Sequence, residues 1–272
     1  RNTARFLLGN LHDFNPAKNA VPLGKMLPMD RWILSKLNRV VGRAREAFED
    51  YEFHLPTYTI HSFCVNELSA LYLDVSKDCL YVEAPDSLTR RSAQTAMWEV
   101  LSAMTRMLAP ILSFTSEEIW QEMRTIDKTL PESVFLSDFT VSNDAAIDEH
   151  LDALWDKVLV LRGASSRMLE GLRAAKTIGT SLEAHVQVKK TDELADIVKA
   201  FSLQEMADIA IVSKFEWVDA LSLEKVCKDE ETGYEMAVAF TSGSKCPRCW
   251  KYSDTPAEDG LCPRCAEVIK VL

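Results

Sequence analysis

The tail of the chain carries the stretch Cys246-Pro247-Arg248-Cys249, and twelve residues later the same pattern returns as Cys262-Pro263-Arg264-Cys265. Two Cys-x-x-Cys pairs that flank one short loop are typical of a zinc site. A tetrahedral zinc ion needs four thiolates at about 2.3 Å, and each tight Pro-containing turn delivers two of them. The stretch therefore predicts that the tail folds around one metal ion.

None of the five histidines lies near the cysteine pairs in the sequence, so the predicted ligands are Cys246, Cys249, Cys262 and Cys265. Four protein ligands leave no open position for water or substrate, which indicates a structural zinc ion and not a catalytic one. Nearby cations can offset the charge of four thiolates by hydrogen bonds to sulfur, or they can contact phosphate. These cations are Lys245, Arg248, Lys251 and Arg264.

Two tryptophans are candidates for contact with an unpaired base. Trp250 directly follows the first cysteine pair, and Trp32 lies at the start of a basic segment. An exposed ring at either place could stack on a base, which is worth about 1–3 kcal/mol. The alternatives are that Trp250 covers the zinc site and that Trp32 packs in the core.

Length and composition indicate a globular protein without a membrane span. A chain of 272 residues with 47% apolar content predicts two domains and a small appendage. No apolar run approaches the roughly 20 residues that a membrane span needs. Seven cysteines, an odd number, argue for a reducing cytoplasm and against a disulfide framework. Cys64, Cys79 and Cys227 have apolar neighbours, so we expect them in the core.

The charge is unevenly distributed. The net charge is −10, yet residues 1–45 contain nine Lys and Arg and only two acids. An acidic body with a basic end can bind a polyanion through that end. A solvated basic helix face is the alternative.

Helical periodicity dominates the first half of the chain. It predicts helices over residues 30–51, with Asp30 as the N-cap, over 56–79, over 86–110, and from Thr115, where Thr115-Ser116-Glu117-Glu118 resembles a capping box. Four helices with short connections predict an antiparallel bundle.

The period changes in the second half. A long helix is expected near residues 151–172, then a strand over 182–189 and a short helix over 192–201. Further strands are expected over 209–212, 223–227 and 236–240. The fold is therefore predicted as mainly α: an antiparallel helical bundle (1–142), a long helix with a small α/β domain (143–241), and a four-cysteine zinc module (242–272).

No catalytic motif accompanies these elements. The sequence contains no Gly-x4-Gly-Lys-[Ser/Thr] loop, no Gly-x-Gly-x-x-Gly and no Gly-x-Ser-x-Gly. We therefore expect a binding fragment that has no catalytic residues of its own.

Several segments together resemble the anticodon-binding region of bacterial isoleucyl-tRNA synthetases, and they occur in that family's order through essentially the whole chain. The segments are Arg1-Asn2-Thr3-Ala4-Arg5-Phe6-Leu7-Leu8-Gly9-Asn10-Leu11, Asp30-Arg31-Trp32-Ile33-Leu34, Tyr72-Leu73-Asp74 with Lys77-Asp78, Arg90-Arg91-Ser92-Ala93-Gln94-Thr95, Leu108-Ala109-Pro110-Ile111-Leu112, Glu117-Glu118-Ile119-Trp120, Ile178-Gly179-Thr180-Ser181-Leu182-Glu183-Ala184 and the cysteine tail. The cysteine tail does most to separate the isoleucine enzymes from their valine, leucine and methionine relatives.

The resemblance implies part of a class I ligase that joins isoleucine to tRNA(Ile) with ATP. The family's His-Ile-Gly-His and Lys-Met-Ser-Lys-Ser motifs do not occur in this sequence. Isoleucine and ATP would therefore bind elsewhere in the whole enzyme, and this part would bind and orient tRNA. A cytoplasmic monomer without membrane contact is expected.

We expect the bundle and the zinc module to hold the anticodon stem-loop, with basic side chains on phosphates and unpaired bases read by stacking. The predicted tRNA-contacting residues are Arg31, Trp32, Arg39, Arg43, Arg248, Trp250, Lys251 and Arg264, with Arg1, Arg5 and Lys36 as further phosphate contacts. The alternatives are a protein-interaction scaffold stabilised by zinc and a DNA-repair glycosylase with a similar four-cysteine finger.

Overall fold

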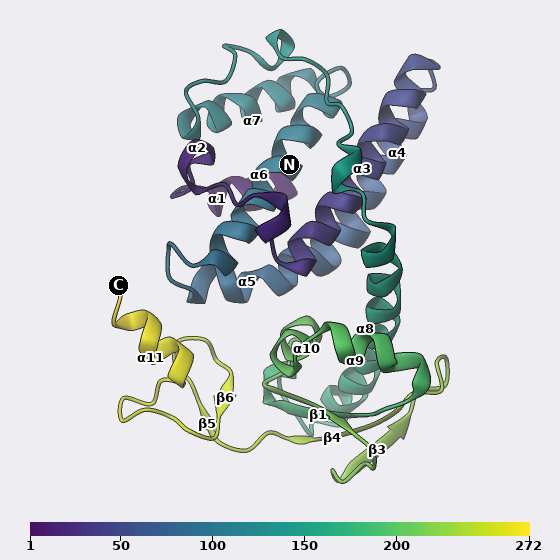
Figure 1. Ribbon diagram of the computed structural model, residues 1–272, viewed down its shortest axis with the longest axis vertical. Coiled ribbons are helices and arrows are strands. Elements are labelled where there is room, and N and C mark those ends of the chain that lie inside the picture. Colours follow the sequence, from purple (N-terminus) through teal and green to yellow (C-terminus); the bar gives the residue numbers. More distant parts are fainter. The chain divides into compact units, whose positions relative to one another are not determined.

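The computed structural model describes residues 1–272, which form two compact units, Arg1–Asp152 and Ala153–Leu272. The first unit is helical, and the second combines helices with two small sheets (Figure 1). The mainly helical fold class is thus confirmed. None of the helices is both long and apolar enough to cross a membrane.

The helices of the first unit are α1 (Asn2–Gly9), α2 (Pro16–Asn19), α3 (Pro28–Glu49), α4 (His54–Phe63), α5 (Leu73–Val82), α6 (Leu88–Leu108) and α7 (Ser113–Ile126). A π-helical segment, η2 (Cys64–Tyr72), joins α4 to α5 without a break, and short 3-10 turns form η1 (Leu23–Lys25), η3 (Val134–Leu136) and η4 (Asp144–Ala146). The predicted helix over residues 56–79 is therefore the middle of a longer helical run.

Helix α3 shows why the apolar spacing is a good predictor. Ile33, Leu37, Val41 and Ala44 recur at helical spacing, and all four are buried. The helix begins earlier than expected, because Pro28 is accommodated in its first turn. Asp30 is consequently not the N-cap but a buried side chain within the helix.

The buried carboxylate of Asp30 joins three helices of the bundle. It accepts hydrogen bonds from the hydroxyl of Tyr72, at 2.6 Å, and from the hydroxyl of Ser92. Burial raises the pKa of Asp30 to about 6, although these two hydrogen bonds lower it. The carboxyl group therefore favours the protonated form more than an exposed aspartate does.

Helix α6 lies at the centre of the bundle, since residues on nearly all sides of it are buried. Ser87 caps its first turn by accepting a hydrogen bond from the amide of Arg90 at 3.2 Å. Helix α7 begins at Ser113, so the predicted capping box at Thr115 is wrong; its Glu117 instead accepts bonds from Ser133 and Val134.

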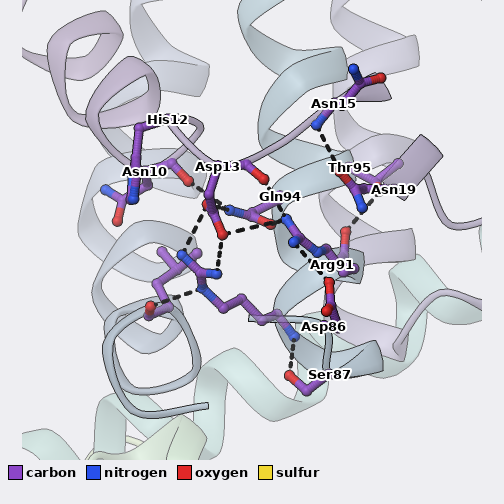
Figure 2. Close-up of polar contacts among 12 residues, drawn as sticks. Asn10, His12, Asp13, Asn15, Asn19, Asp86, Ser87, Arg91, Gln94 and Thr95 are labelled. Carbon is purple, nitrogen blue, oxygen red and sulfur yellow. Dashed lines mark hydrogen bonds and ion pairs between the residues drawn. The ribbon is translucent and has the colours of Figure 1, made fainter. Parts of the chain in front are cut away.

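A polar network ties the segment between α1 and α2 to α6. Figure 2 shows Asp13 facing Arg91 and Gln94. Its carboxylate accepts hydrogen bonds from Gln94, at 2.8 Å, and from both terminal nitrogens of Arg90. Arg91 donates to the Asp13 carbonyl at 2.9 Å and to Asp86 at 3.0 Å. Both arginines are buried, so these partners neutralise two charges inside the unit.

The second unit contains most of α8 (Glu149–Ala174), with η5 (Ser181–Glu183), η6 (Asp192–Leu194), α9 (Ala195–Ala200), α10 (Leu203–Ala210) and α11 (Pro263–Ile269). Its main sheet has the order β2-β1-β4-β3, formed by β1 (Ala184–Lys189), β2 (Lys214–Val218), β3 (Lys225–Lys228) and β4 (Glu235–Phe240). Strands β1 and β2 are parallel and the other pairs antiparallel. A two-stranded sheet, β5 (Ser244–Lys245) with β6 (Tyr252–Ser253), precedes α11.

Two local predictions in this unit are wrong. Residues 209–212 are not a strand, because they complete α10 and leave it through Ile211 in a left-handed conformation. Cys227 is not in the core, because β3 is an edge strand whose four residues are exposed. Cys64 and Cys79 are half-buried. The two units divide within α8, so the proposed three-domain partition, with boundaries at 142/143 and 241/242, remains a prediction.

Candidate metal centre and nucleic-acid interface

The four cysteines of the tail converge from two local structures. Cys246 and Cys249 lie in the turn between β5 and β6, while Cys262 is the N-cap of α11 and Cys265 lies in its first turn. Pro263 occupies the first position of α11, where its missing amide hydrogen is not needed. The repeated Cys-Pro-Arg-Cys pattern therefore folds in two different ways, as a turn and as a helix start.

The geometry of the four sulfur atoms fits a tetrahedral metal ion. All four Sγ atoms lie within 4.8 Å of one another, and those of Cys249 and Cys262 are 3.7 Å apart. Ligands at about 2.3 Å in a tetrahedron would be about 3.8 Å apart. All four cysteines are free, so none is used in a disulfide. The cluster is a site suited to a metal ion.

Burial and backbone amides act on these thiols in opposite directions. Burial is the largest influence on Cys246, but the amides of Cys249, Cys262 and Arg248 outweigh it and lower the pKa of Cys246 to about 6. At Cys249 burial prevails and raises the pKa. Burial and hydrogen bonding therefore shift the pKa values of these two neighbouring thiols in opposite directions.

The first cysteine turn holds Trp250 in an unusual conformation. Its amide donates to the carbonyl of Cys246 at 2.9 Å, and its φ of 66° lies in the left-handed region. The side chain is 62% exposed, and the ammonium group of Lys245 lies 5.9 Å from the ring centroid. Of the two possibilities for Trp250, the exposed ring favours an external partner over a cover for the thiols.

A close approach of two backbone segments fixes the start of the same region. Gly243 has a φ of 92°, and a side chain there would collide with the carbonyl of Ser253 in β6. Only glycine fits this position. Gly243 therefore lets the chain approach β6 closely, just before β5 and the first cysteine turn begin.

The predicted cations around the cluster have different partners. Arg248 donates to the sulfur of Cys265 at 3.7 Å, as expected for an offset of thiolate charge. Lys251 pairs with Asp208 of α10 and is mostly buried, which attaches the tail to the rest of its unit. Arg264 is half-buried, and Lys245 is exposed. Lys245 and Trp250 thus form the accessible part of this surface.

The basic face predicted on α3 is largely neutralised. Arg31 pairs with Asp148 at 2.7 Å, and Arg39 donates to Asp152 at 2.9 Å. Lys36 lies 3.9 Å from the same carboxylate of Asp152. No local pattern pointed to these acids, because they follow Arg31 and Arg39 by more than a hundred residues.

The remaining predicted positions in the first unit differ sharply in exposure. Arg1, Arg5 and Arg43 are exposed, and Arg43 forms no ion pair. Trp32 is fully buried, with none of its surface accessible. Core packing therefore describes Trp32, and we leave it out of the candidate interface.

Comparison with known proteins identifies the class of this bundle. A family model described as "Anticodon-binding domain of tRNA ligase" matches residues 30–188. The chain belongs to this family of anticodon-binding domains of tRNA ligases.

Within that class, the chain resembles isoleucine–tRNA ligases over its whole length, as its segments predicted. It is 42% identical to the isoleucine–tRNA ligase of Carboxydothermus hydrogenoformans over 276 aligned residues, 41% to that of Persephonella marina and 40% to that of Desulforamulus reducens. These alignments cover 99–100% of this chain and 29% of each relative. The chain spans less than a third of the length of these relatives.

Proposed function

We propose that the chain binds and orients the anticodon stem-loop of tRNA(Ile) within a ligase that attaches isoleucine to that tRNA with hydrolysis of ATP. Membership of the anticodon-binding family and similarity to isoleucine ligases support this assignment. The observation that carries it is the exposed, left-handed Trp250 beside the four-thiol cluster, with Lys245 near its ring. A ring and a cation side by side suit an unpaired base and its phosphate.

We propose zinc as the ion of the cluster, with Cys246, Cys249, Cys262 and Cys265 as its ligands. An all-cysteine set favours zinc among the common metal ions, and the sulfur spacing fits its tetrahedral geometry. The bound ion would hold the turn and α11 together in a segment too small for a core of its own. The first cysteine turn would then present the indole ring of Trp250 in one orientation.

The other predicted tRNA-contacting residues are ranked by whether their charge is already paired within the chain. Arg43 is the best phosphate contact on α3, since it is exposed and has no ion pair. Arg31 and Arg39 would have to exchange a carboxylate for a phosphate, which lowers the net gain. Lys251, Arg248 and Arg264 remain proposed contacts; Lys251 also pairs with Asp208, and Arg248 also donates to the sulfur of Cys265.

The test compares Trp250 variants in the zinc-loaded chain. Trp250→Ala should weaken binding of a tRNA(Ile) anticodon stem-loop by about 5-fold or more, the value of one lost stack. Trp250→Phe should retain much of the affinity, and both variants should keep one zinc per chain. Unchanged RNA affinity in Trp250→Ala would remove the stacking role.

A panel of tRNA isoacceptors separates this proposal from a scaffold that uses zinc only for folding. Preference for tRNA(Ile) supports anticodon reading, whereas equal binding of all isoacceptors contradicts it. A cytoplasmic, monomeric protein is the form in which we propose that this binding occurs.

A further inference from the structure

The turn between α3 and α4 carries a second exposed aromatic residue in left-handed backbone. Tyr51 has a φ of 60°, its amide donates to the carbonyl of Phe48 at 3.2 Å, and the amide of Glu52 donates to that of Ala47 at 2.8 Å. This is the pattern that ends many helices at a glycine or an asparagine. Tyr51 is 80% exposed, so burial of the ring does not explain the choice of tyrosine.

The ring of Tyr51 belongs to a chain of aromatic contacts that reaches inward. Tyr51 and Phe53 meet edge to face at 6.0 Å, Phe53 lies 5.9 Å from Phe48, and Phe48 lies 5.4 Å from Phe139. Such contacts orient the outer rings against the inner ones. The exposed rings are therefore held in place as a surface.

Further exposed apolar side chains follow in the first turns of α4. Phe53 is 52% exposed and Tyr58 is 73% exposed, with Leu55 one turn before Tyr58 on the same side of the helix. We call the exposed apolar residues Tyr51, Phe53, Leu55 and Tyr58 the aromatic tip. Large apolar side chains gathered at one exposed turn mark an interaction surface more often than isolated ones do.

The charge around the aromatic tip decides the kind of partner. Residues 43–52, which lead into it, contain four carboxylates, those of Glu46, Glu49, Asp50 and Glu52, against the two cations Arg43 and Arg45, and no further Lys or Arg occurs before Lys77. Only Glu49 has an ion pair, with Arg45 at 3.0 Å. Phosphates would be repelled by this surface, whereas a cationic group would be attracted.

We propose that the aromatic tip is a docking site for an arginine-rich segment of a protein partner. A planar guanidinium group can stack on an aromatic ring and pair with carboxylates in its own plane. A lysine ammonium group stacks on a ring less well. Tyr51 and Phe53 provide the rings, and Asp50 and Glu52 provide carboxylates that are free of ion pairs. This docking is independent of the proposed tRNA binding.

The experiment titrates a fluorescent hexa-arginine peptide into the zinc-loaded 272-residue chain. Tyr51→Gly should weaken binding by about 2- to 5-fold, the share of one exposed cation–π contact. The same substitution relieves the left-handed strain and should raise the melting temperature, so the loss cannot come from unfolding. Tyr51→Phe keeps the ring and should bind as the parent chain does.

The matched controls locate the effect at the aromatic tip. Tyr81 is 61% exposed on α5, outside the tip, and Tyr81→Ala should leave peptide affinity unchanged. Asp50→Asn combined with Glu52→Gln should weaken binding and reduce its salt dependence. Equal affinity for Tyr51→Gly and the parent chain, equal binding of hexa-lysine, or tight binding of an RNA stem-loop at Tyr51 would each overturn the proposal.

Discussion

Trp250 and Tyr51 are both exposed aromatic residues in left-handed backbone, but their surroundings have opposite charge. Trp250 lies beside Lys245 and directly follows the first Cys-Pro-Arg-Cys turn, whereas Tyr51 follows Glu49 and Asp50 and precedes Glu52. The same strained geometry presents a ring in each case. The charge around the ring then selects between a polyanion and a cationic partner.

The two positions also differ in what holds them. The turn of Trp250 depends on four thiols that converge on one point, while the turn of Tyr51 depends on backbone hydrogen bonds and on an edge-to-face contact with Phe53. A metal ion can stabilise a small segment by more than any single contact in a helical bundle. The first region should therefore respond to chelation, and the second should not.

Metal removal should produce the largest difference between the region of Trp250 and the region of Tyr51. A structural zinc site contributes on the order of 10 kcal/mol to the folding of its segment, so Cys265→Ser or a strong chelator should disorder residues near the cluster. Limited proteolysis should then cut between β5 and α11, while the turn at Tyr51 stays protected. Loss of most helical circular dichroism on chelation would contradict a metal role confined to the tail.

Asp13→Ala should destabilise the first unit, which carries Tyr51, and leave the metal cluster of the second unit unchanged. Removing this carboxylate leaves the buried guanidinium of Arg90 without its ion-pair partner, which should destabilise the first unit by about 3–4 kcal/mol. Urea unfolding should detect the change, and zinc content should remain at one ion per chain. Asp86→Ala is the matched control, since Asp86 is exposed and pairs with Arg91 alone, and should have a much smaller effect.

Acid should change the stability of the first unit through two buried or half-buried carboxyl groups, Asp30 and Asp13. Because burial raises the pKa of Asp30 to about 6, the folded first unit holds a proton between pH 4 and 6 that the unfolded chain has released. Its free energy of unfolding should therefore fall as pH rises through this window, by up to about 3 kcal/mol from this group.

Asp30→Asn isolates that contribution, because an amide does not titrate. Urea midpoints of the parent chain and of Asp30→Asn should converge near pH 4 and separate toward pH 6, with the variant more stable there. The pKa of Asp13 is shifted in the opposite direction: burial raises it, but hydrogen bonds and nearby guanidinium groups lower it by more. The stabilisation from Asp13 is therefore lost as pH falls. Parallel curves for the two proteins would contradict the buried, titrating Asp30.

The sequence predicted local periodicity and ligand spacing well, and long-range pairing poorly. The apolar period of α3 and the doubled cysteine pairs each depend on neighbours within a few residues. The neutralisation of Arg31 and Arg39 depends on Asp148 and Asp152, which no local pattern connects to α3. The candidate cations could therefore be found by sequence, but their availability could not.

One missed element did have a local signal. Ser202 and Glu205 form a reciprocal capping box at the start of α10, and the pattern Ser-x-x-Glu is visible in the sequence. The apolar run at residues 209–212 is too short to separate a buried strand from a helix end by periodicity. The cap decides in favour of the helix.

Glycine in place of Tyr51 or Trp250 gives the smallest change in stability and the sharpest test of the comparison. Tyr51→Gly and Trp250→Gly should each stabilise their own region by about 1 kcal/mol, because glycine adopts a positive φ without strain. Thermal unfolding of the zinc-loaded chains should show this gain. Alanine at the same positions keeps the strain and serves as the control.

Binding should change in the opposite direction, and in a crossed pattern. Trp250→Gly should lose affinity for the anticodon stem-loop and keep it for hexa-arginine, while Tyr51→Gly should do the reverse. If a residue serves only to form its own turn, glycine at that position should stabilise the chain without loss of affinity for either ligand. If both ligands respond to the same variant, charge does not separate the two rings, and the distinction between an RNA surface and a protein-docking surface fails. If each variant is more stable and loses only its own ligand, the strain at both positions is retained for binding.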